Sequence, residues 1–270
     1  MALADDPHSP PAADAGAAAA PLQRDRVAGL EKGLAVIEAF DQERPRLTIA
    51  EVADRTGLTR AAARRYLITL QHLGFVSQDR KMFALTAKVL RLSQSYMHSA
   101  RLPRIVQPEL HQLSLTLKEA SSAGVLDGND VLCIAATNGG RNVSATLQPG
   151  TRVPAYCTSN GRVLLAGRPQ AEVEAWVARQ RLQSLTPFTC TDPARLAAAV
   201  ARARADGHAC VDQELELGLR TVSVPLIDHR GEVAAALNIS VHAARMTMDD
   251  LLASALPPLQ LAQARLRQLL

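Results

Sequence analysis

The stretch from Leu47 to Phe75 constrains the fold most, because it predicts two short helices separated by a tight turn. Thr48 and Glu51 have the Thr-x-x-Glu spacing of a capping box, in which each side chain bonds to the other residue's backbone N–H at the start of a helix. Leu47 and Val52 stand where a hydrophobic staple fixes the direction in which the chain enters that helix. A helix is therefore expected to begin directly after Thr48.

Three consecutive residues predict the turn and the second helix. Gly57 supplies the positive φ that ends the first helix, Leu58 is expected to be buried in the turn, and Thr59 can cap the next helix through its hydroxyl. Apolar residues then recur at three- and four-residue steps, which indicates one buried face: Ala63, Leu67, Leu70 and Leu73 or Gly74.

The opposite face of this second helix carries Arg60, Ala61, Arg64 and Arg65. Arginine can bond bidentately to guanine or to a phosphate, and a small alanine lets a helix approach the major groove closely. The alternative is an ordinary helical hairpin with a solvated basic face. Two caps, a turn glycine and clustered arginines in one run favour a recognition helix instead.

Two apolar segments, residues 75–77 and 82–85, flank a polar run and predict a hairpin with Arg80 and Lys81 at its tip. A preceding helix is expected to end before Pro45 and to bury one stripe, namely Leu30, Leu34, Ile37 and Phe40. Three helices and a hairpin make a winged helix-turn-helix domain, whose wing contacts the DNA backbone. The residues expected at the DNA interface are Thr48, Thr59, Arg60, Ala61, Arg64, Arg65, Arg80 and Lys81.

Charge is distributed unevenly along the 270 residues. Residues 24–101 carry fourteen Lys and Arg against eight Asp and Glu, whereas residues 102–270 carry sixteen against fifteen. The N-terminal half therefore favours a polyanionic partner, and double-stranded DNA with a palindromic or repeated operator is expected.

The second half predicts an antiparallel sheet flanked by helices. Strands at 123–127 and 131–137, and again at 222–227 and 232–241, flank turn residues and predict two hairpins. Helices are expected near 159–166, 169–179 and 193–206, and a long one from about Thr247. Residues 86–119 read as helices that link the halves, either as a plain spacer or as dimer contacts.

The expected fold class is α+β, with four segments. Residues 1–25, rich in Ala, Pro and Asp, are expected to be a disordered tail, and residues 26–86 the winged helix-turn-helix domain. Residues 87–100 are expected to be a linker helix, and residues 101–270 an effector-binding domain.

Several classes of protein are disfavoured. The four cysteines are widely spaced without C-x-x-C or clustered histidines, so no metal site is expected and a reducing cytoplasm fits. No apolar run approaches the roughly 18 residues that span a bilayer, so no membrane partner is expected. No glycine-rich phosphate loop and no G-x-S-x-G elbow occur, so neither a cofactor nor a catalytic residue is predicted.

From about Val27 to its C-terminus the sequence resembles the IclR family of bacterial transcription regulators. The matching blocks are residues 33–37 with 70–75, residues 154–166 (PAYCTSNGRVLLA), residues 212–220 (DQELELGLR) and residues 236–241 (ALNISV). The blocks at 154–166 and 212–220 look most like the branch that governs catabolism of protocatechuate, 4-hydroxybenzoate and β-ketoadipate, whose members commonly activate transcription.

The resemblance implies a GAF-like C-terminal domain that binds a small aromatic or dicarboxylic acid. Carried over by position, the pocket would include Ser159, Asn160, Asp212, Thr221, Asn238 and Ser240. Tyr156 shares the parity of Thr158 and could meet an aromatic ring, while Arg220 could neutralise the acidic residues of its block. A single winged helix recognises too few base pairs for a bacterial operator, so a homodimer or a dimer of dimers is expected, with residues 86–119 contributing.

Three alternatives stay open. One is a repressor of the same family that senses a short keto or dicarboxylic acid. Another is an enzyme with Cys157 as nucleophile and His208 or His229 as base, although no motif supplies the oxyanion site that such chemistry needs. The third is a redox sensor that uses Cys157 or Cys210, which lacks a resolving cysteine nearby in the sequence.

Overall fold

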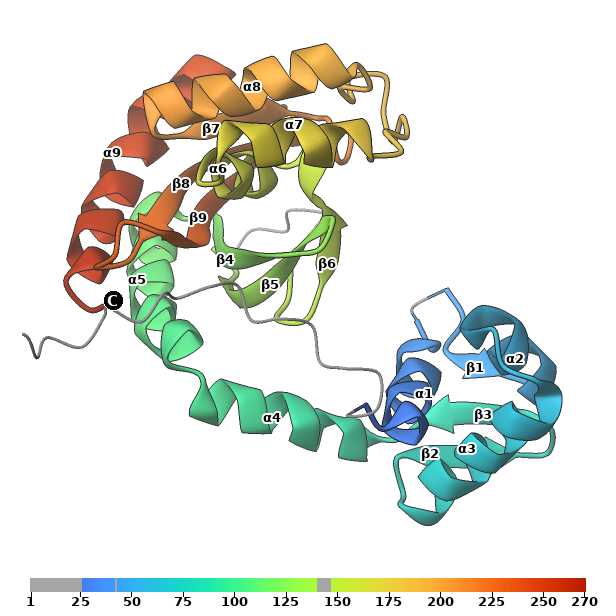
Figure 1. The fold of residues 1–270 in the computed structure, drawn as a ribbon. Helices are drawn as coiled ribbons and strands as arrows, with labels where there is room; N and C mark the ends of the chain where they lie inside the picture. The colour runs from blue at the N-terminus through green and yellow to red at the C-terminus, as the bar shows by residue number, and fades with distance from the viewer. Residues whose placement is uncertain (1–25, 42, 140–146) are drawn as a thin grey trace, which may run out of the picture. The chain divides into compact units, whose positions relative to one another are not determined.

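The computed structural model describes residues 26–41, 43–139 and 147–270 (Figure 1). The tail expected at residues 1–25 lies outside the described residues. The chain divides into two compact units, of which the first ends at Leu92 and the second runs from Ser93 to Leu270.

The first unit has the winged helix-turn-helix fold that the sequence predicted. Its elements are α1 (Ala28–Glu38), β1 (Arg46–Leu47), α2 (Ile49–Thr56), α3 (Arg60–His72), β2 (Val76–Asp79) and β3 (Met82–Leu85). The antiparallel sheet has the order β1-β3-β2, and the wing turns at Arg80 and Lys81. The short strand β1 was not expected.

Both predicted helix caps are present. The Thr48 hydroxyl accepts from the Glu51 backbone N–H, and the Glu51 carboxylate accepts from the Thr48 backbone at 2.7 Å. Gly57 ends α2 at φ 66°, and the Thr59 hydroxyl accepts from the Ala62 N–H at the start of α3. These local interactions fix where α2 begins and ends and where α3 begins.

The expected stripe of α1 is partly wrong. Leu30 and Leu34 are 63% and 47% exposed, whereas Val36 is fully buried and Phe40 packs against the core. The buried side of α1 is centred on Val36 and Ala39, and of the predicted stripe Ile37 also packs against this core. On α3, Ala63, Leu67 and Leu70 are buried as expected. Leu58 in the turn is only half-buried, and Leu73 is exposed.

Helical segments follow the wing. A 3-10 turn (Ala87–Val89), capped by Thr86, leads into α4 (Leu90–Ser99) and α5 (Arg101–Leu117). In α5 the side chains of Val106, Leu110 and Leu113 are buried against the sheet of the second unit.

The second unit is an antiparallel sheet flanked by helices, as predicted (Figure 1). Its strands are β4 (Ala120–Asp127), β5 (Asp130–Thr137), β6 (Arg152–Pro154), β7 (Ala209–Asp212), β8 (Leu219–Ile227) and β9 (Val233–His242), in the order β6-β5-β4-β9-β8-β7. Its remaining helices are α6 (Ser159–Ala166), α7 (Gln170–Ala178), α8 (Pro193–Asp206) and α9 (Met248–Arg267). Both expected hairpins are present, and the sequence did not reveal β6 and β7.

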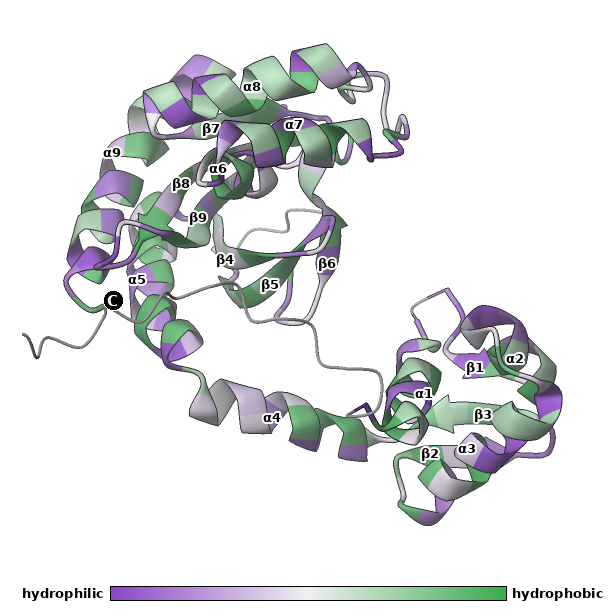
Figure 2. Ribbon diagram, viewed as in Figure 1, coloured by the Kyte–Doolittle hydropathy of each residue, from purple (hydrophilic) through white to green (hydrophobic). Residues whose placement is uncertain are grey.

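The sheet separates two apolar cores. On one face α5 and α9 pack on alternate residues of β8 and β9, such as Val222, Val224 and Ile239. On the other face α6, α7 and α8 gather around Leu165 and Trp176. Figure 2 shows hydrophobic residues along the strands and alternating hydrophilic patches on the outer helices α8 and α9. Among the helices of the described chain, none is long and apolar enough to cross a membrane.

Candidate functional site

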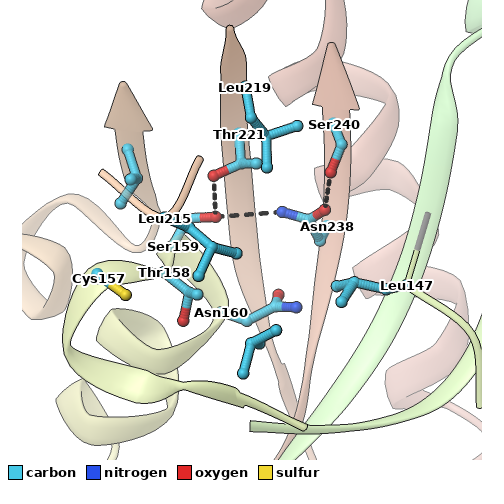
Figure 3. Close-up of a pocket in the computed structure, with 12 residues that line it drawn as sticks. Leu147, Cys157, Thr158, Ser159, Asn160, Leu215, Leu219, Thr221, Asn238 and Ser240 are labelled. Atoms are coloured by element: carbon cyan, nitrogen blue, oxygen red, sulfur yellow. Dashed lines mark hydrogen bonds between the residues drawn. The ribbon is translucent and has the colours of Figure 1, made fainter. Parts of the chain in front are cut away.

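A cavity opens where the start of α6 meets strands β7, β8 and β9 (Figure 3). We call it the effector cavity. About 430 Å³ between its walls is free of protein atoms, the open mouth included. Its lining residues are Leu147, Val153, Cys157, Thr158, Ser159, Asn160, Val211, Leu215, Leu219, Thr221, Asn238 and Ser240.

Close packing fixes the start of α6. A 3-10 turn (Ala155–Cys157) precedes the helix, and the Thr158 hydroxyl caps it by accepting from the Gly161 N–H at 3.1 Å. A Cβ on Gly161 would lie 2.0 Å from the Ala155 carbonyl oxygen, so only glycine lets the helix sit this close to the preceding turn. The first turn of α6 is thereby held at the wall of the cavity.

That first turn presents backbone donors to the cavity. Ser159 and Asn160 are the first two residues of α6, so their N–H groups have no acceptor within the helix. Both residues are buried and line the cavity. The positive end of a helix favours a carboxylate at such a position.

The polar side chains of the cavity form a hydrogen-bond network that has a direction (Figure 3). Ser240 Oγ donates to Asn238 Oδ1 at 2.7 Å. Asn238 Nδ2 in turn donates to Ser159 Oγ at 3.1 Å and to Ser223 Oγ at 3.0 Å. Ser159 Oγ and Ser223 Oγ also lie 2.7 Å apart, where either hydroxyl can donate, and each has a single hydrogen to share between its acceptors.

The network ends in two donors. Ser223 Oγ donates to Asn160 Oδ1 at 2.9 Å, and Ser159 Oγ donates to Thr221 Oγ1 at 2.8 Å. The Asn160 amide N–H and the Thr221 hydroxyl hydrogen have no acceptor among the described residues. At the other end of the network, the Ser240 hydroxyl hydrogen is already donated to Asn238, so Ser240 Oγ can only accept a bond from a ligand. The cavity therefore offers donors for an anion and one acceptor for a hydroxyl.

The rest of the wall is apolar. Leu147, Val153, Val211, Leu215 and Leu219 supply aliphatic surface, and no charged side chain occurs among the lining residues that the structure describes. Ligand sites of this kind combine an apolar wall with a few placed polar groups that orient the ligand. The sequence did not single out these aliphatic residues or Ser223, although Leu219 and Ser223 share the parity of Thr221 along β8.

Asp212 and Arg220 do not line the cavity, contrary to the expectation. Successive side chains of a strand point to opposite faces of the sheet. Thr221 and Val211 face the cavity, so their neighbours Arg220 and Asp212 point to the other face. The expected pairing itself is present, since Arg220 Nε donates to Asp212 Oδ1 at 2.8 Å. The Arg220 guanidinium also donates to the carbonyl of Met246 at 2.7 Å, which ties β8 to the segment before α9.

Tyr156 is also outside the lining. Its hydroxyl donates to the Gln183 carbonyl at 2.9 Å, and its ring is buried in the core beside α7. The prediction assumed strand parity from Tyr156 to Thr158, whereas this segment is a 3-10 turn in which alternate residues do not share a side. Cys157 lines the cavity instead.

Cys157 is a poor nucleophile. Burial, followed by the nearby Glu214 carboxylate, raises the pKa of Cys157 from its ordinary 9.0 to about 12, so the thiol stays protonated at neutral pH. Its Sγ lies 3.6 Å from the Pro154 carbonyl oxygen. The two histidines considered as bases form hydrogen bonds with backbone carbonyls: His208 Nδ1 bonds to the Asp206 carbonyl, and His229 Nδ1 bonds to the Leu270 carbonyl.

The DNA-binding residues predicted on α3 share an exposed face. Arg60, Ala61, Arg64 and Arg65 are all exposed, and Arg80 and Lys81 are exposed at the tip of the wing. Thr48 and Thr59 use their hydroxyls as helix caps, as described above, so they position the two helices. The basic face of α3 remains the predicted DNA contact.

The two units match two halves of one family. Residues 29–80 match the IclR helix-turn-helix domain, and residues 94–266 match the C-terminal domain of the bacterial transcriptional regulator IclR. The chain therefore belongs to the IclR family, and it is a DNA-binding transcriptional regulator with an effector-binding domain rather than an enzyme.

Similar proteins within the family include regulators of aromatic acid catabolism. A Pca regulon regulatory protein of Pseudomonas putida is 41% identical over 265 residues, which cover 92% of this chain and 91% of that protein. A p-hydroxybenzoate hydroxylase transcriptional activator of Acinetobacter baylyi is 37% identical over 250 residues, with 91% and 92% covered.

Two solved structures have the same fold. A transcriptional regulator from Rhodococcus sp. RHA1 has a TM-score of 0.78 at 43% identity, covering 90% of this chain and 98% of that one. The inducer-binding domain of an Acinetobacter PobR double mutant, complexed with 3-hydroxybenzoic acid, has a TM-score of 0.60 at 30% identity, covering 63% of this chain and all of that one.

Proposed function

We propose that this protein senses a hydroxylated aromatic acid, such as 4-hydroxybenzoate or protocatechuate, in the effector cavity and then activates genes for its catabolism. The observation that carries the proposal is the direction of the hydrogen-bond network. Donors converge from the first turn of α6 and from the Asn160 amide, and a carboxylate accepts such bonds. The aliphatic wall suits the ring.

The same network provides for a ring hydroxyl. Thr221 and Ser240 face each other across β8 and β9 and both line the cavity. Thr221 keeps a hydrogen to donate, and Ser240 keeps lone pairs to accept. A phenol both donates and accepts, so it satisfies this pair, whereas the ring C–H groups of an aromatic acid without a hydroxyl satisfy neither.

Activation is proposed from the relatives. The Acinetobacter relative is named as a transcriptional activator, and it matches this chain over nearly its whole length. A β-ketoadipate-type dicarboxylic acid is the second candidate ligand, because the Pseudomonas relative regulates a Pca regulon. For such an acid the second carboxylate would have to lie against the aliphatic wall.

A thermal-shift screen tests the ligand class. The full-length protein would be heated with 4-hydroxybenzoate, protocatechuate, β-ketoadipate, muconate and short keto acids. A ligand at a hundred times its dissociation constant stabilises the fold by about 2.7 kcal/mol. We expect the hydroxylated aromatic acids to stabilise most. Equal or larger stabilisation by the keto acids would overturn the proposal in favour of a different effector.

We further propose that the regulator works in the cytoplasm, as a homodimer or dimer of dimers on a palindromic or repeated operator. One winged helix reads few base pairs, and a two-fold protein reads two half-sites about one helical turn apart. Leu92 and Tyr96, one turn apart on α4, are 49% and 46% exposed and offer an apolar surface to a second copy. Light scattering that found a monomer both free and on DNA would contradict the proposal.

A further inference from the structure

A second cavity lies between α6, α8, β7 and α9. We call it the basic cavity, after Arg162, Arg202 and His208 in its wall, which also includes Asp206 and Cys210. About 530 Å³ between its walls is free of protein atoms, open space included. It shares no lining residue with the effector cavity.

The inner wall of the basic cavity contains an incompletely paired arginine. Arg162 is only 7% exposed, and its Nη2 donates to Glu214 Oε1 at 2.6 Å. Its Nη1 makes a long bond of 3.4 Å to the Cys210 carbonyl, and its Nε has no acceptor. Burying a guanidinium costs free energy unless its donors are paired, so a buried arginine with spare donors needs an explanation.

The mouth of the basic cavity adds a second arginine and a histidine. Arg202 and Asp206, one turn apart on α8, are exposed, and His208 is half-buried beside them. The His208 Nδ1 lies 3.0 Å from the Asp206 carbonyl oxygen, which can only accept, so Nδ1 carries a hydrogen and Nε2 is left for other contacts. Asp206 is the one acidic residue of this wall, against two arginines.

We propose that the basic cavity binds a small oxyanion, a carboxylate or a phosphate, with Arg162 at its inner end and Arg202 at its mouth. Arginine presents a planar fork of donors that matches both groups. Nε is too deeply buried to reach such a ligand, so the oxyanion would accept from Arg162 Nη1, which has only the long 3.4 Å bond to the Cys210 carbonyl. The ion pair of Arg162 and Glu214 lies next to the effector cavity in the chain. Arg162 follows the lining residue Ser159 by one turn of α6, and Glu214 directly precedes the lining residue Leu215.

Equilibrium dialysis of the full-length protein against labelled inorganic phosphate tests the proposal. We expect one saturable phosphate per chain. Arg202→Gln should weaken its binding about tenfold, the effect of losing one bond to a charged group. Arg195→Gln, on the same helix but outside the cavity, should bind as the parent does. Arg162→Gln is less useful, because it leaves Glu214 buried without its partner.

Two further arms locate the site and identify the ligand. Asn238→Ala, which alters the effector cavity, should leave phosphate binding unchanged. Displacement of phosphate by millimolar acetate would identify a carboxylate site, and its failure a phosphate site. The proposal is overturned if neither anion binds saturably, if Arg195→Gln weakens binding as much as Arg202→Gln, or if Asn238→Ala abolishes binding while Arg202→Gln does not.

Discussion

Ser159 Oγ donates a 2.8 Å hydrogen bond to Thr221 Oγ1, which joins the first residue of α6 to strand β8 at the wall of the effector cavity. Because Thr221 accepts this bond, its own hydrogen is available to a ligand. A ligand that engages the Thr221 hydroxyl therefore acts on α6 and on β8 at once. This link connects occupancy of the cavity to the packing of the effector-binding unit.

The Thr221 hydroxyl can be tested by itself. Thr221→Val keeps the shape of the side chain and removes the hydroxyl, so a hydroxylated aromatic acid should bind roughly ten- to a hundredfold more weakly, as expected for a lost bond to a buried polar or charged group. Thr221→Ser should restore most of the affinity. Calorimetry measures both, and equal affinities for the Val and Ser variants would show that the hydroxyl makes no contact.

DNA recognition should depend on the exposed face of α3. Replacing Arg64 with Ala should weaken operator binding by about 1 to 3 kcal/mol if the side chain reads a base. The Arg60, Arg64 and Arg65 triple Ala variant should abolish specific binding in a gel-shift assay. Arg195→Ala, at an exposed arginine on α8 of the second unit, is the matched control and should bind as the parent does. A folded triple variant with unchanged binding would remove α3 from the interface.

Gly161 should tolerate no side chain. Gly161→Ala places a Cβ 2.0 Å from the Ala155 carbonyl oxygen, so α6 must move and both stability and acid binding should fall. Gly33→Ala is the control, because its Cβ meets nothing nearer than 3.9 Å inside helix α1. That variant should gain up to about 1 kcal/mol from helix propensity. Urea unfolding measures both, and a stable Gly161→Ala variant with parental ligand affinity would contradict the geometry.

Two buried thiols should make stability depend on alkaline pH. Burial raises the pKa of Cys133 from 9.0 to about 11 and contributes most to the rise of Cys157 to about 12. Below pH 9 both folded and unfolded chains keep these protons. Between about pH 9 and 11 only the unfolded chain releases them, so the free energy of unfolding should fall by about 1.4 kcal/mol per thiol and pH unit. Urea titrations at pH 8, 9 and 10 measure the slope.

Replacing both thiols provides the comparison. The Cys133→Ala and Cys157→Ala double variant should lose this component of the slope. An identical slope in the parent and the double variant would assign the alkaline destabilisation to other groups.

Local sequence signals predicted much of this fold. The capping box at Thr48, the turn at Gly57 and the turn residues of both hairpins act within a few residues, so their structural consequences could be read from the chain. Asn238 and Ser240, which the resemblance implied for the pocket, alternate along β9 and both line the cavity.

The remaining features depend on tertiary contacts. Which side of α1 is buried depends on its packing against α2 and α3, which the periodicity of α1 does not contain. Tyr156 was misplaced because a 3-10 turn was taken as a strand. The aliphatic wall of the effector cavity comes from the segment before β6, from β6 and β7, from the turn after β7 and from β8, and only their meeting identifies Val153 or Val211 as lining residues.

The most direct test of the central claim is calorimetric titration of the full-length protein with 4-hydroxybenzoate and protocatechuate. We predict that the parent binds at least one of these acids and that Asn238→Ala, which breaks the network at its centre, binds it roughly ten- to a hundredfold more weakly. Its operator affinity without acid should match the parent's. If Asn238→Ala bound the acid as tightly as the parent, or if the parent bound no aromatic acid, the effector cavity would not be the sensor.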